Sequence, residues 1–487
     1  MKKLIIVPLL MGFLAFGMVT PSHAGGIAIT ATGVRAVSLG GAYRALSGDW
    51  SGGYWNPAGL TQVKNWNFGA SVSFITPLAK ITLAPYQGHR LYGFAYREAV
   101  AKPQTFIIPN LGLVKTLDNG LSVGLGLFIP FGLGATWDLY NPVPGFGNTA
   151  NFPKDDNVGN VQVMDFHLSL AYPVTEQLSL GVGAGLVYST LSMEQTTVTK
   201  IAALNPQLAP IAIAPHDHFP VDQTLKGTGV SASASVGLQL KATDQLTLGL
   251  AARFYQNVPL KGSVVGDAYF PYSANALGTL KALHDAKQLS DAEYQQAAVL
   301  FSGTKQQMID DNEVKASMPL PMNIGAGVAF RPMENLLLSF DVSFTQWSVW
   351  NVIKIENLTM KDGTPVEASL NEHWKDGIRY SLGTEYTLMK TGGKDLVLRL
   401  GYYYDPSPIP DETLNPGIPD ISPKNSITAG FGFTQGKYTI NAVYSHLFIK
   451  NRDVKKWVLE PSGANENYAG LYKVTDNEFH IGFGYSF

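Results

Sequence analysis

Two polar residues, Asp165 and His167, stand two positions apart in a segment that alternates apolar and polar side chains. Successive side chains of a strand point to opposite faces, so this pair shares one face. A carboxylate beside an imidazole can support acid–base hydrolysis of a lipid or peptide, and His480 near the C-terminus offers a second imidazole. Mixed charges inside a protein more often pair with one another. The pair therefore predicts either a hydrolytic site or a structural ion-pair network.

The same alternation predicts further inward-facing charges on other segments. These are Arg253, Asp341, Arg379, Glu385 and Arg399. A cation in an otherwise apolar pocket can hold a carboxylate, and either Arg253 or Arg379 could take that role. His216-Asp217-His218 could hold a metal ion, but two histidines and one aspartate in a loop are a weak pattern. We expect neither a metal nor a cofactor.

Strands must position these residues, because large apolar side chains recur at every second position along most of the chain. Residues 178–188 and 336–344 are clear examples, with Gly, Ser, Thr and occasional charges on the opposite face. This period of two indicates half-buried strands. It predicts fourteen of them, at residues 66–75, 105–116, 121–131, 160–172, 178–192, 226–241, 246–258, 318–331, 335–350, 376–388, 395–405, 426–435, 437–448 and 476–487.

The connections between these strands alternate between short and long. The short links lie at residues 117–120, 173–177, 242–245, 332–334, 390–394 and 436. The long excursions lie at residues 76–104, 130–159, 191–225, 259–317, 351–375, 406–425 and 449–475. Short turns on one side and long loops on the other are typical of a transmembrane barrel with periplasmic turns and extracellular loops. A soluble propeller or sandwich would not need this asymmetry.

Composition and both chain ends fit an exported all-β protein. The chain has 487 residues, no Cys, 15% charged residues and a net charge of −2, which favours neither disulfides nor a nucleic-acid partner. Residues 1–24 combine two lysines, an apolar run and Ser22-His23-Ala24, the pattern of a cleaved secretory signal. An uncleaved anchor is the alternative. The last nine residues alternate and end in Phe487, which resembles the terminal signal of outer-membrane barrels in Gram-negative bacteria.

Residues 25–64 lie between the signal and the first strand. This segment holds Trp50, Tyr54 and Trp55, and a disordered tail seldom carries so many aromatic residues. A compact plug inside the barrel is therefore the better interpretation. The chain is predicted to be all-β: a signal peptide (1–24), then a hatch (25–64) inside the lumen of a 14-stranded antiparallel transmembrane β-barrel (65–487).

Several separated motifs resemble the FadL family of outer-membrane transporters for long-chain fatty acids and other hydrophobic compounds. They are Asn56-Pro57-Ala58 with Gly59-Leu60 in the hatch, Pro130-Phe131-Gly132-Leu133 after the third strand, and Thr345-Gln346-Trp347-Ser348 after the ninth. The most specific is the run Leu-Arg-Leu-Gly-Tyr-Tyr-Tyr-Asp-Pro-Ser-Pro-Ile-Pro-Asp at residues 398–411, followed by Ile418-Pro419-Asp420. Their order and spacing extend the resemblance over the whole mature chain.

The resemblance implies how such a protein works. Extracellular loops capture the ligand, which moves to an inner pocket and leaves sideways through a gap in the wall, without ATP. In the family the gap lies at a kink in the third strand, which here places a lateral gate at Pro130, Phe131 and Gly132. Proline cannot donate a ladder hydrogen bond and glycine weakens pairing, so the wall could part there. The alternative is that Pro130 simply starts a loop.

Other roles follow from the resemblance together with the inward-facing charges. The mature N-terminus, Gly25-Gly26-Ile27, is expected to contribute to the inner pocket, beside Arg253 or Arg379 as a carboxylate partner. Arg399, together with Asp341 and Glu385, is expected to anchor the hatch, with Arg399 against the Asn56-Pro57-Ala58 turn. The apolar loop at residues 201–214 and the loop at 274–301, where Ser290 and Glu293 form a capping box, are expected either to capture ligand or simply to cap the barrel.

The chain is thus expected to be an outer-membrane channel for passive uptake of long-chain fatty acids or similar hydrophobic compounds. A transporter of aromatic or aliphatic hydrocarbons is the first alternative, and a lipid hydrolase is the second; we expect no enzyme. The plug argues against an open porin. The expected partners are hydrophobic small molecules, with outer-membrane lipid and lipopolysaccharide around a monomer.

Overall fold

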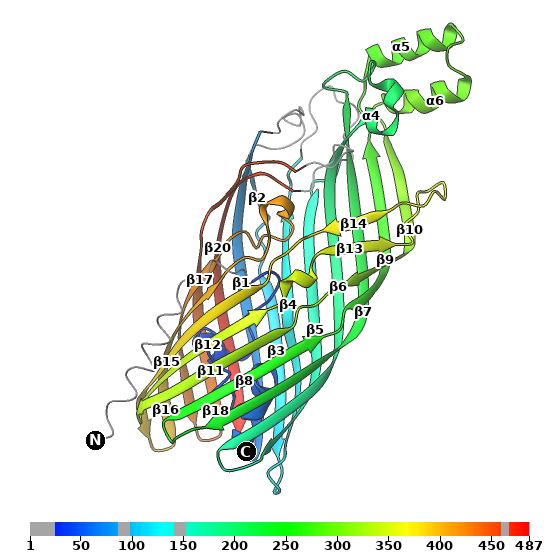
Figure 1. Cartoon of the computed structure of the whole chain (residues 1–487). Helices are drawn as coiled ribbons and strands as arrows, with labels where there is room; N and C mark the ends of the chain where they lie inside the picture. Colours follow the sequence, from blue (N-terminus) through cyan, green and yellow to red (C-terminus); the bar gives the residue numbers. More distant parts are fainter. Residues whose placement is uncertain (1–24, 86–97, 141–151, 459–466, 487) are drawn as a thin grey trace.

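The computed structural model describes residues 25–85, 98–140, 152–458 and 467–486 (Figure 1). The predicted signal peptide and the terminal Phe487 lie outside these residues. Within them, no helix combines the length and the apolar character that a membrane crossing requires.

Fourteen long antiparallel strands form the closed barrel that the alternation predicted. Each pairs with the next over at least part of its length, and β20 pairs with β1 along its whole length, so the ring closes. The wall strands are β1 (Trp66–Leu83), β3 (Phe106–Thr116), β4 (Ser122–Trp137), β5 (Asn157–Pro173), β6 (Leu178–Lys200), β7 (His218–Lys241), β8 (Leu246–Tyr255), β11 (Asn323–Met333), β12 (Leu336–Thr345), β15 (Gly377–Thr391), β16 (Lys394–Asp405), β17 (Lys424–Gln435), β18 (Tyr438–Ile449) and β20 (Gly470–Ser486).

The outer face of the wall is apolar and the inner face is polar. On β20, Phe479, Ile481 and Phe483 are exposed outward, whereas Glu478 and His480 are buried in the lumen. The same arrangement, with apolar side chains outside and polar side chains inside, repeats around the ring, because lipid surrounds the barrel and the hatch fills it. The alternation in the sequence therefore correctly predicted which side chains of the wall face the lipid and which face the lumen.

The predicted excursion at residues 259–317 was wrong in one respect, because it contains two further strands. β9 (Val258–Tyr269) pairs with the upper part of β7 and with β10 (Lys305–Met318), and β10 continues to β13 (Val352–Glu356) and β14 (Ala368–Asn371). These strands extend the sheet beyond the ring (Figure 1). They escaped prediction because strands outside the lipid need no apolar outer face, and β10 reads Lys-Gln-Gln-Met-Ile-Asp-Asp-Asn-Glu.

Short elements cover the extracellular end. α5 (Ala274–Asp285) and α6 (Asp291–Val299) form a projecting hairpin (Figure 1), and the capping box at Ser290 and Glu293 is present as predicted. The remaining elements there are α4 (Ile201–Leu204), η3 (Pro206–Leu208), η4 (Trp347–Val349), η5 (Asp411–Thr413), β2 (Glu98–Val100) and β19 (Arg452–Val454).

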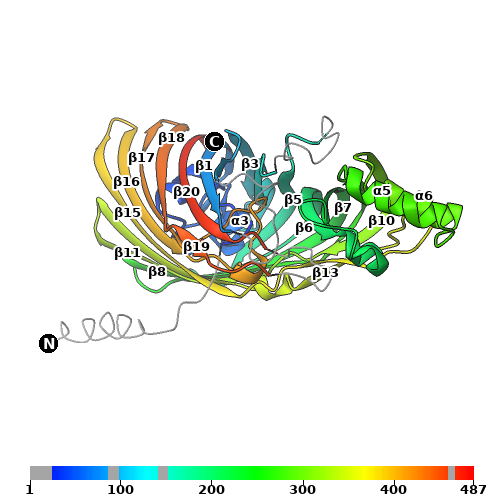
Figure 2. The ribbon, with the colours of Figure 1, turned by 90° about the horizontal axis from the view of Figure 1, so that it is seen from above.

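Residues 25–65 lie inside the ring, as Figure 2 shows when the molecule is seen from above. This segment contains α2 (Val34–Ser38), α3 (Gly52–Trp55) and η1 (Pro57–Gln62). It approaches the wall closely at Gly40, whose φ is +64°; a Cβ atom there would lie 2.6 Å from the Tyr402 carbonyl oxygen. Only glycine combines this backbone conformation with this contact.

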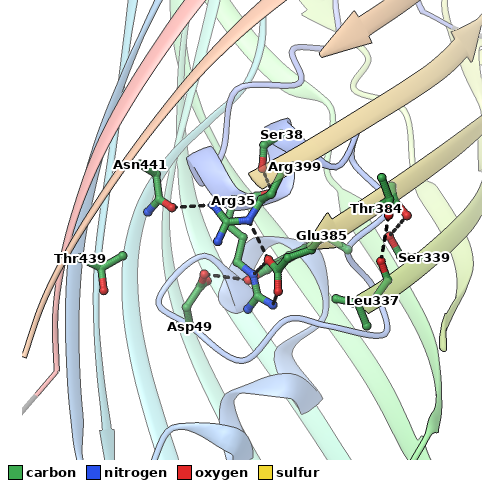
Figure 3. A network of polar contacts seen from close by, with 12 residues as sticks. Arg35, Ser38, Asp49, Leu337, Ser339, Thr384, Glu385, Arg399, Thr439 and Asn441 are labelled. Atoms are coloured by element: carbon green, nitrogen blue, oxygen red, sulfur yellow. Dashed lines mark hydrogen bonds and ion pairs between the residues drawn. The ribbon is translucent and has the colours of Figure 1, made fainter. Parts of the chain in front are cut away.

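Buried ion pairs hold this hatch to the wall. Glu385 on β15 accepts hydrogen bonds from Arg35 of α2 (2.9 and 3.0 Å) and from Arg399 of β16 (2.7 Å), and Arg399 also donates to Asn441 on β18 (2.8 Å; Figure 3). A second pair joins Arg44 to Asp341 (3.2 Å). The paired charges offset each other's desolvation.

One expected contact is wrong. Arg399 does not meet the Asn56 turn, because Glu385 and Asn441 take its hydrogen bonds. The Asn56 amide instead donates to the carbonyls of Arg44 and Leu238 (2.8 and 3.0 Å), and its oxygen accepts from the Ala58 N–H. The turn is thus fixed to β7 by neutral hydrogen bonds.

Replacing Glu385 by Gln tests the ion-pair anchor. The change leaves the buried Arg399 and the partly buried Arg35 without this counter-charge, and breaking a buried pair costs on the order of 3 kcal/mol of unfolding free energy. We expect a clearly lower midpoint of urea unfolding in detergent micelles. The exposed Glu367→Gln variant, which removes an equal charge, should unfold like the unmodified protein. Equal midpoints for both variants would refute the anchor.

Candidate functional site

The barrel wall is broken between β3 and β4. The two strands pair only from Leu111 with Leu127 to Thr116 with Ser122, although β4 runs on to Trp137 and stays paired with β5. A bulge between Phe128 and Phe131 interrupts the register with β5 at the same height. Pro130 therefore lies inside a kinked strand and does not start a loop. Residues 106–110 of β3 face the break from its other side.

The N-terminal tip of the chain occupies this break. Ile29 donates its N–H to the Pro130 carbonyl (3.0 Å), Gly132 donates to the Ile27 carbonyl (2.9 Å), and Ala28 and Phe131 form an antiparallel bridge. The tip thus pairs with β4 where β3 does not. The predicted gate residues and the predicted tip residues lie against each other.

Asn110 on β3 closes the other edge of the break. Its side-chain oxygen accepts from the Ile129 N–H (3.0 Å), and its amide donates to the Ala31 carbonyl (3.3 Å). One buried side chain therefore bridges β3, β4 and the tip. Sequence reasoning missed Asn110, because a single inward-facing amide on an ordinary strand gives no separate signal.

Two cavities lie on either side of the tip. A smaller one, about 90 Å³, is lined by Arg44, Tyr54, Arg253 and Arg379 toward the hatch. A larger one, about 250 Å³, lies beside the wall break. Residues 28–30 line both cavities, so the tip stands between them. The larger cavity meets the break along an apolar wall made by Ile75, Phe106, Ile108, Ile129, Leu133 and Val161.

Both candidate carboxylate partners line the smaller cavity, but each already has internal partners. Arg253 donates to Asp165 (2.9 Å) and to the Gly53 and Tyr54 carbonyls (2.7 and 3.0 Å). Arg379 lies over the Tyr403 ring, 3.8 Å from its centroid, and pairs with Asp405 at 3.6 Å. The nitrogen that pairs with Asp405 also donates to the Thr30 hydroxyl, and the second terminal nitrogen donates to the Gly40 carbonyl. A ligand carboxylate would have to displace these groups.

Asp165 and His167 belong to a closed polar network. Asp165 accepts from Ser233 (2.9 Å) and from Arg253, and lies 3.3 Å from the His167 ring, whose other nitrogen is 2.8 Å from Ser235. Ser235, His167 and Asp165 thus contact one another in that order. Arg253 and Ser233 share the carboxylate, however, so the network positions Arg253 and joins β5, β7 and β8.

Polar contacts also hold the first described residues in place. Gly26 donates its N–H to Asp420 (2.5 Å), which pairs with Lys424 (2.9 Å). A Cβ atom at Gly26 would lie 2.9 Å from the rings of both Trp347 and Trp374, and its φ is +52°. Burial raises the pKa of Asp420, and the neighbouring Lys424 ammonium opposes that rise. Asp420 stands in the Ile418-Pro419-Asp420 motif, which carried part of the family resemblance.

The extracellular loops are only partly exposed. Ile201, Leu208, Leu280 and Phe301 are buried, whereas Ile213 is 69% exposed. Packing of the loops on one another therefore accounts for most of their apolar residues. Capture of a ligand by these loops stays a prediction.

A family model described as outer membrane protein transport protein (OMPP1/FadL/TodX) matches residues 18–487. Outer membrane protein P1 of Haemophilus influenzae is 22% identical over 350 residues, covering 68% of this chain and 66% of that protein. The long-chain fatty acid transport protein of Escherichia coli is 24% identical over 386 residues, covering 75% and 73%.

Two solved structures share the fold. A Pseudomonas aeruginosa FadL homologue has a TM-score of 0.69 at 18% identity, covering 95% of this chain and 100% of its own. The toluene transporter TodX of Pseudomonas putida has a TM-score of 0.64 at 17% identity, covering 96% and 99%. The family match over nearly the whole chain replaces the hydrolase alternative by a non-enzymatic transport protein. The chain belongs to the OMPP1/FadL/TodX family and is an outer-membrane transporter of hydrophobic compounds from a Gram-negative bacterium.

Proposed function

We propose that this protein takes up hydrophobic compounds passively and releases them sideways into the bilayer through the break between β3 and β4. Long-chain fatty acids and aromatic or aliphatic hydrocarbons both fall within the proposal, because the E. coli relative is named for the former and TodX for toluene. The observation that carries it is the tip of the chain, paired into the break beside a cavity of about 250 Å³.

The apolar surroundings of the break support this exit. Ile107 is 60% exposed on the outer face of β3, and Phe106 and Ile108 on either side line the cavity. A compound leaving here moves from an apolar wall into lipid without crossing water. A route along the barrel axis would instead pass the charged hatch. Burial of apolar surface all along the path therefore favours the lateral exit.

Opening this exit requires little free energy compared with moving the hatch. Two backbone hydrogen bonds join residues 27–29 to β4, and each contributes about 1 kcal/mol net when another partner takes its place. The hatch body is held by buried ion pairs, whose disruption costs several times more. We therefore assign movement to the tip, with Gly25, Gly26 and Ile27 as ligand-responsive residues and Pro130, Phe131 and Gly132 as the gate.

The remaining roles complete the proposal. Loops at residues 201–214 and 274–301 make the first contact with the ligand, and Arg253 and Arg379 line the inner cavity through which it passes. The barrel acts as a monomer surrounded by outer-membrane lipid and lipopolysaccharide, because β20 pairs with β1 and the wall closes on itself without a partner chain.

Uptake by cells tests the function directly. Cells that lack their own transporter and express this chain should accumulate radiolabelled oleate or labelled toluene faster than cells carrying an empty vector. The rate should not depend on an ATP supply, because the proposed route is passive. Absence of any faster uptake, with the barrel shown to be inserted in the outer membrane, would refute the transport proposal.

A disulfide across the gate tests the lateral exit. Ala28 and Phe131 are a non-hydrogen-bonded antiparallel pair, with Cα atoms about 4.5 Å apart in such pairs, and the protein has no cysteine of its own. In the Ala28→Cys, Phe131→Cys double variant we expect oxidation to reduce uptake at least tenfold. A reductant should restore it, because the tip can then leave β4.

The two single-cysteine variants serve as controls and should be insensitive to oxidant. Formation of the bond can be verified by mass spectrometry of the digested protein. Equal uptake by the fully oxidised and the reduced double variant would show that the tip does not need to move, and so would exclude this gate.

A further inference from the structure

The outer surface of the wall carries four lysines on four neighbouring strands. They are Lys226 on β7, Lys261 on β9, Lys315 on β10 and Lys354 on β13, and all four are exposed. β7 pairs with β9, β9 with β10, and β10 with β13, so these strands follow one another in the sheet (Figure 1). We call the four residues the lysine patch.

The register shows that the lysines of β7, β9 and β10 point outward. Val230 is 50% exposed on the lipid side of β7, and Thr228 and Lys226 follow it toward the extracellular end in steps of two, so they share its face. Thr228 lies opposite Lys261, and Lys261 lies opposite Lys315. Residues directly opposite each other in a sheet point to the same side.

Lys354 joins the same face on β13. Glu356 lies opposite Lys315, and Lys354 stands two residues from Glu356 on the same strand. Val352, two residues nearer the lipid than Lys354, is 45% exposed. Two residues of a strand span about 7 Å. The patch therefore lies at the height where the hydrocarbon ends and the head groups of the outer leaflet begin.

The acids near the patch do not neutralise it. Within the part of the chain that the structure describes, no ion pair joins an acid to any of the four lysines. Three acids stand close by, and in the register each lies two residues farther from the lipid than a lysine: Glu194 beyond Lys226, Glu313 beyond Lys315 and Glu356 beyond Lys354. From the lipid outward, this part of the wall is thus apolar, then basic, then acidic.

A second opposed lysine pair on the wall shows how the protein balances such a contact elsewhere. Lys80 on β1 lies opposite Lys473 on β20, and Glu98 of β2 is 2.6 Å from the Lys80 ammonium. Like charges directly opposite each other repel, and there an acid of the chain offsets the repulsion. Lys261 and Lys315 are opposed in the same way but have no such acid among the described residues, so their counter-charge must come from outside.

Hydroxyl groups alternate with these ammonium groups. Ser263 lies opposite Lys226, and Ser369 lies opposite Lys354. Lysine ammonium groups bind phosphate as point charges, and serine hydroxyls can donate further hydrogen bonds to its oxygens. Basic residues at the edge of a membrane attract anionic head groups. The donors and their height therefore fit a phosphorylated lipid.

We propose that the lysine patch binds the phosphate groups of lipopolysaccharide in the outer leaflet. This lipid carries several phosphates on one molecule, so one molecule can meet more than one lysine, while its acyl chains lie on the apolar wall below Val230 and Val352. The phosphates offset the repulsion between Lys261 and Lys315 and fix the height at which this side of the wall meets the head groups. The site is separate from the proposed exit between β3 and β4.

Binding of lipid A, the phosphorylated anchor of lipopolysaccharide, tests this site. Its dephosphorylated form keeps the same sugars and acyl chains and serves as the matched probe. Fluorescent derivatives of both are titrated against the purified protein in micelles of a neutral detergent. At low salt we expect the phosphorylated form to bind at least tenfold more tightly. High salt should reduce this difference, because it screens exposed charges.

Removing the opposed pair should remove the preference. In the Lys261→Gln, Lys315→Gln double variant we expect the affinity for phosphorylated lipid A to fall at least tenfold, with no change for the dephosphorylated form. The Lys390→Gln, Lys437→Gln variant removes the same charge from exposed residues at the periplasmic end of the wall. This control should bind both lipids like the unmodified protein.

Thermal unfolding separates lipid binding from folding. Without lipid, the Lys261→Gln, Lys315→Gln variant should unfold at a temperature no lower than that of the unmodified protein, because it loses a repelling pair. Phosphorylated lipid A should raise the unfolding temperature of the unmodified protein and of the control, since a ligand that binds only the folded state stabilises it. It should leave the double variant unchanged.

Three results would overturn the assignment. The first is equal binding of both forms of lipid A by the unmodified protein, and the second is an unchanged preference in the double variant. The third is binding of phosphatidylglycerol as tight as that of phosphorylated lipid A, which would make the patch a general anionic surface. Transport does not enter these measurements, so failure of the proposed function would not alter them.

Discussion

The structure depends on satisfying backbone hydrogen bonds in a wall that lipid surrounds. Water is absent from the bilayer core, so every N–H and C=O there needs a partner in the protein. β3 and β4 part above Leu111 and Leu127, which leaves the edge of β4 without its neighbour. Residues 27–29 of the tip supply the missing partner from inside the barrel. A gap in the wall is therefore compatible with the membrane only while another segment can pair with its edge.

This requirement explains why the hatch is divided into a fixed body and a lightly held tip. Arg35 and Arg44 join the body to Glu385 and Asp341 through buried charges. The tip is joined to β4 by neutral backbone bonds, and to the loop after β16 through Gly26 and Asp420. The energetic difference lets the tip exchange partners without loosening the body. Proline at position 130 helps, because a residue without an N–H has one less bond to replace.

Much of this fold could be predicted from periodicity, and the exceptions have physical reasons. Lipid enforces alternation, so the wall strands and the inward direction of Arg253, Glu385 and Arg399 followed from parity. β9 and β10 lie beyond the lipid, where nothing enforces the pattern. The partner of each inward charge could not be predicted either, because pairing depends on the register of strands far apart in sequence. For that reason Arg399 was expected at the Asn56 turn and is found with Glu385.

The sizes of the two cavities connect the ligand to the gate. Pockets for small molecules usually measure about 300 to 1,000 Å³, and neither cavity alone, at about 90 and 250 Å³, reaches that range. Residues 28–30 line both, so displacement of the tip on the proposed route would join the two volumes. On the proposed route, a ligand that displaces the tip also removes the partner of β4. The binding free energy of the ligand is then the source of the opening.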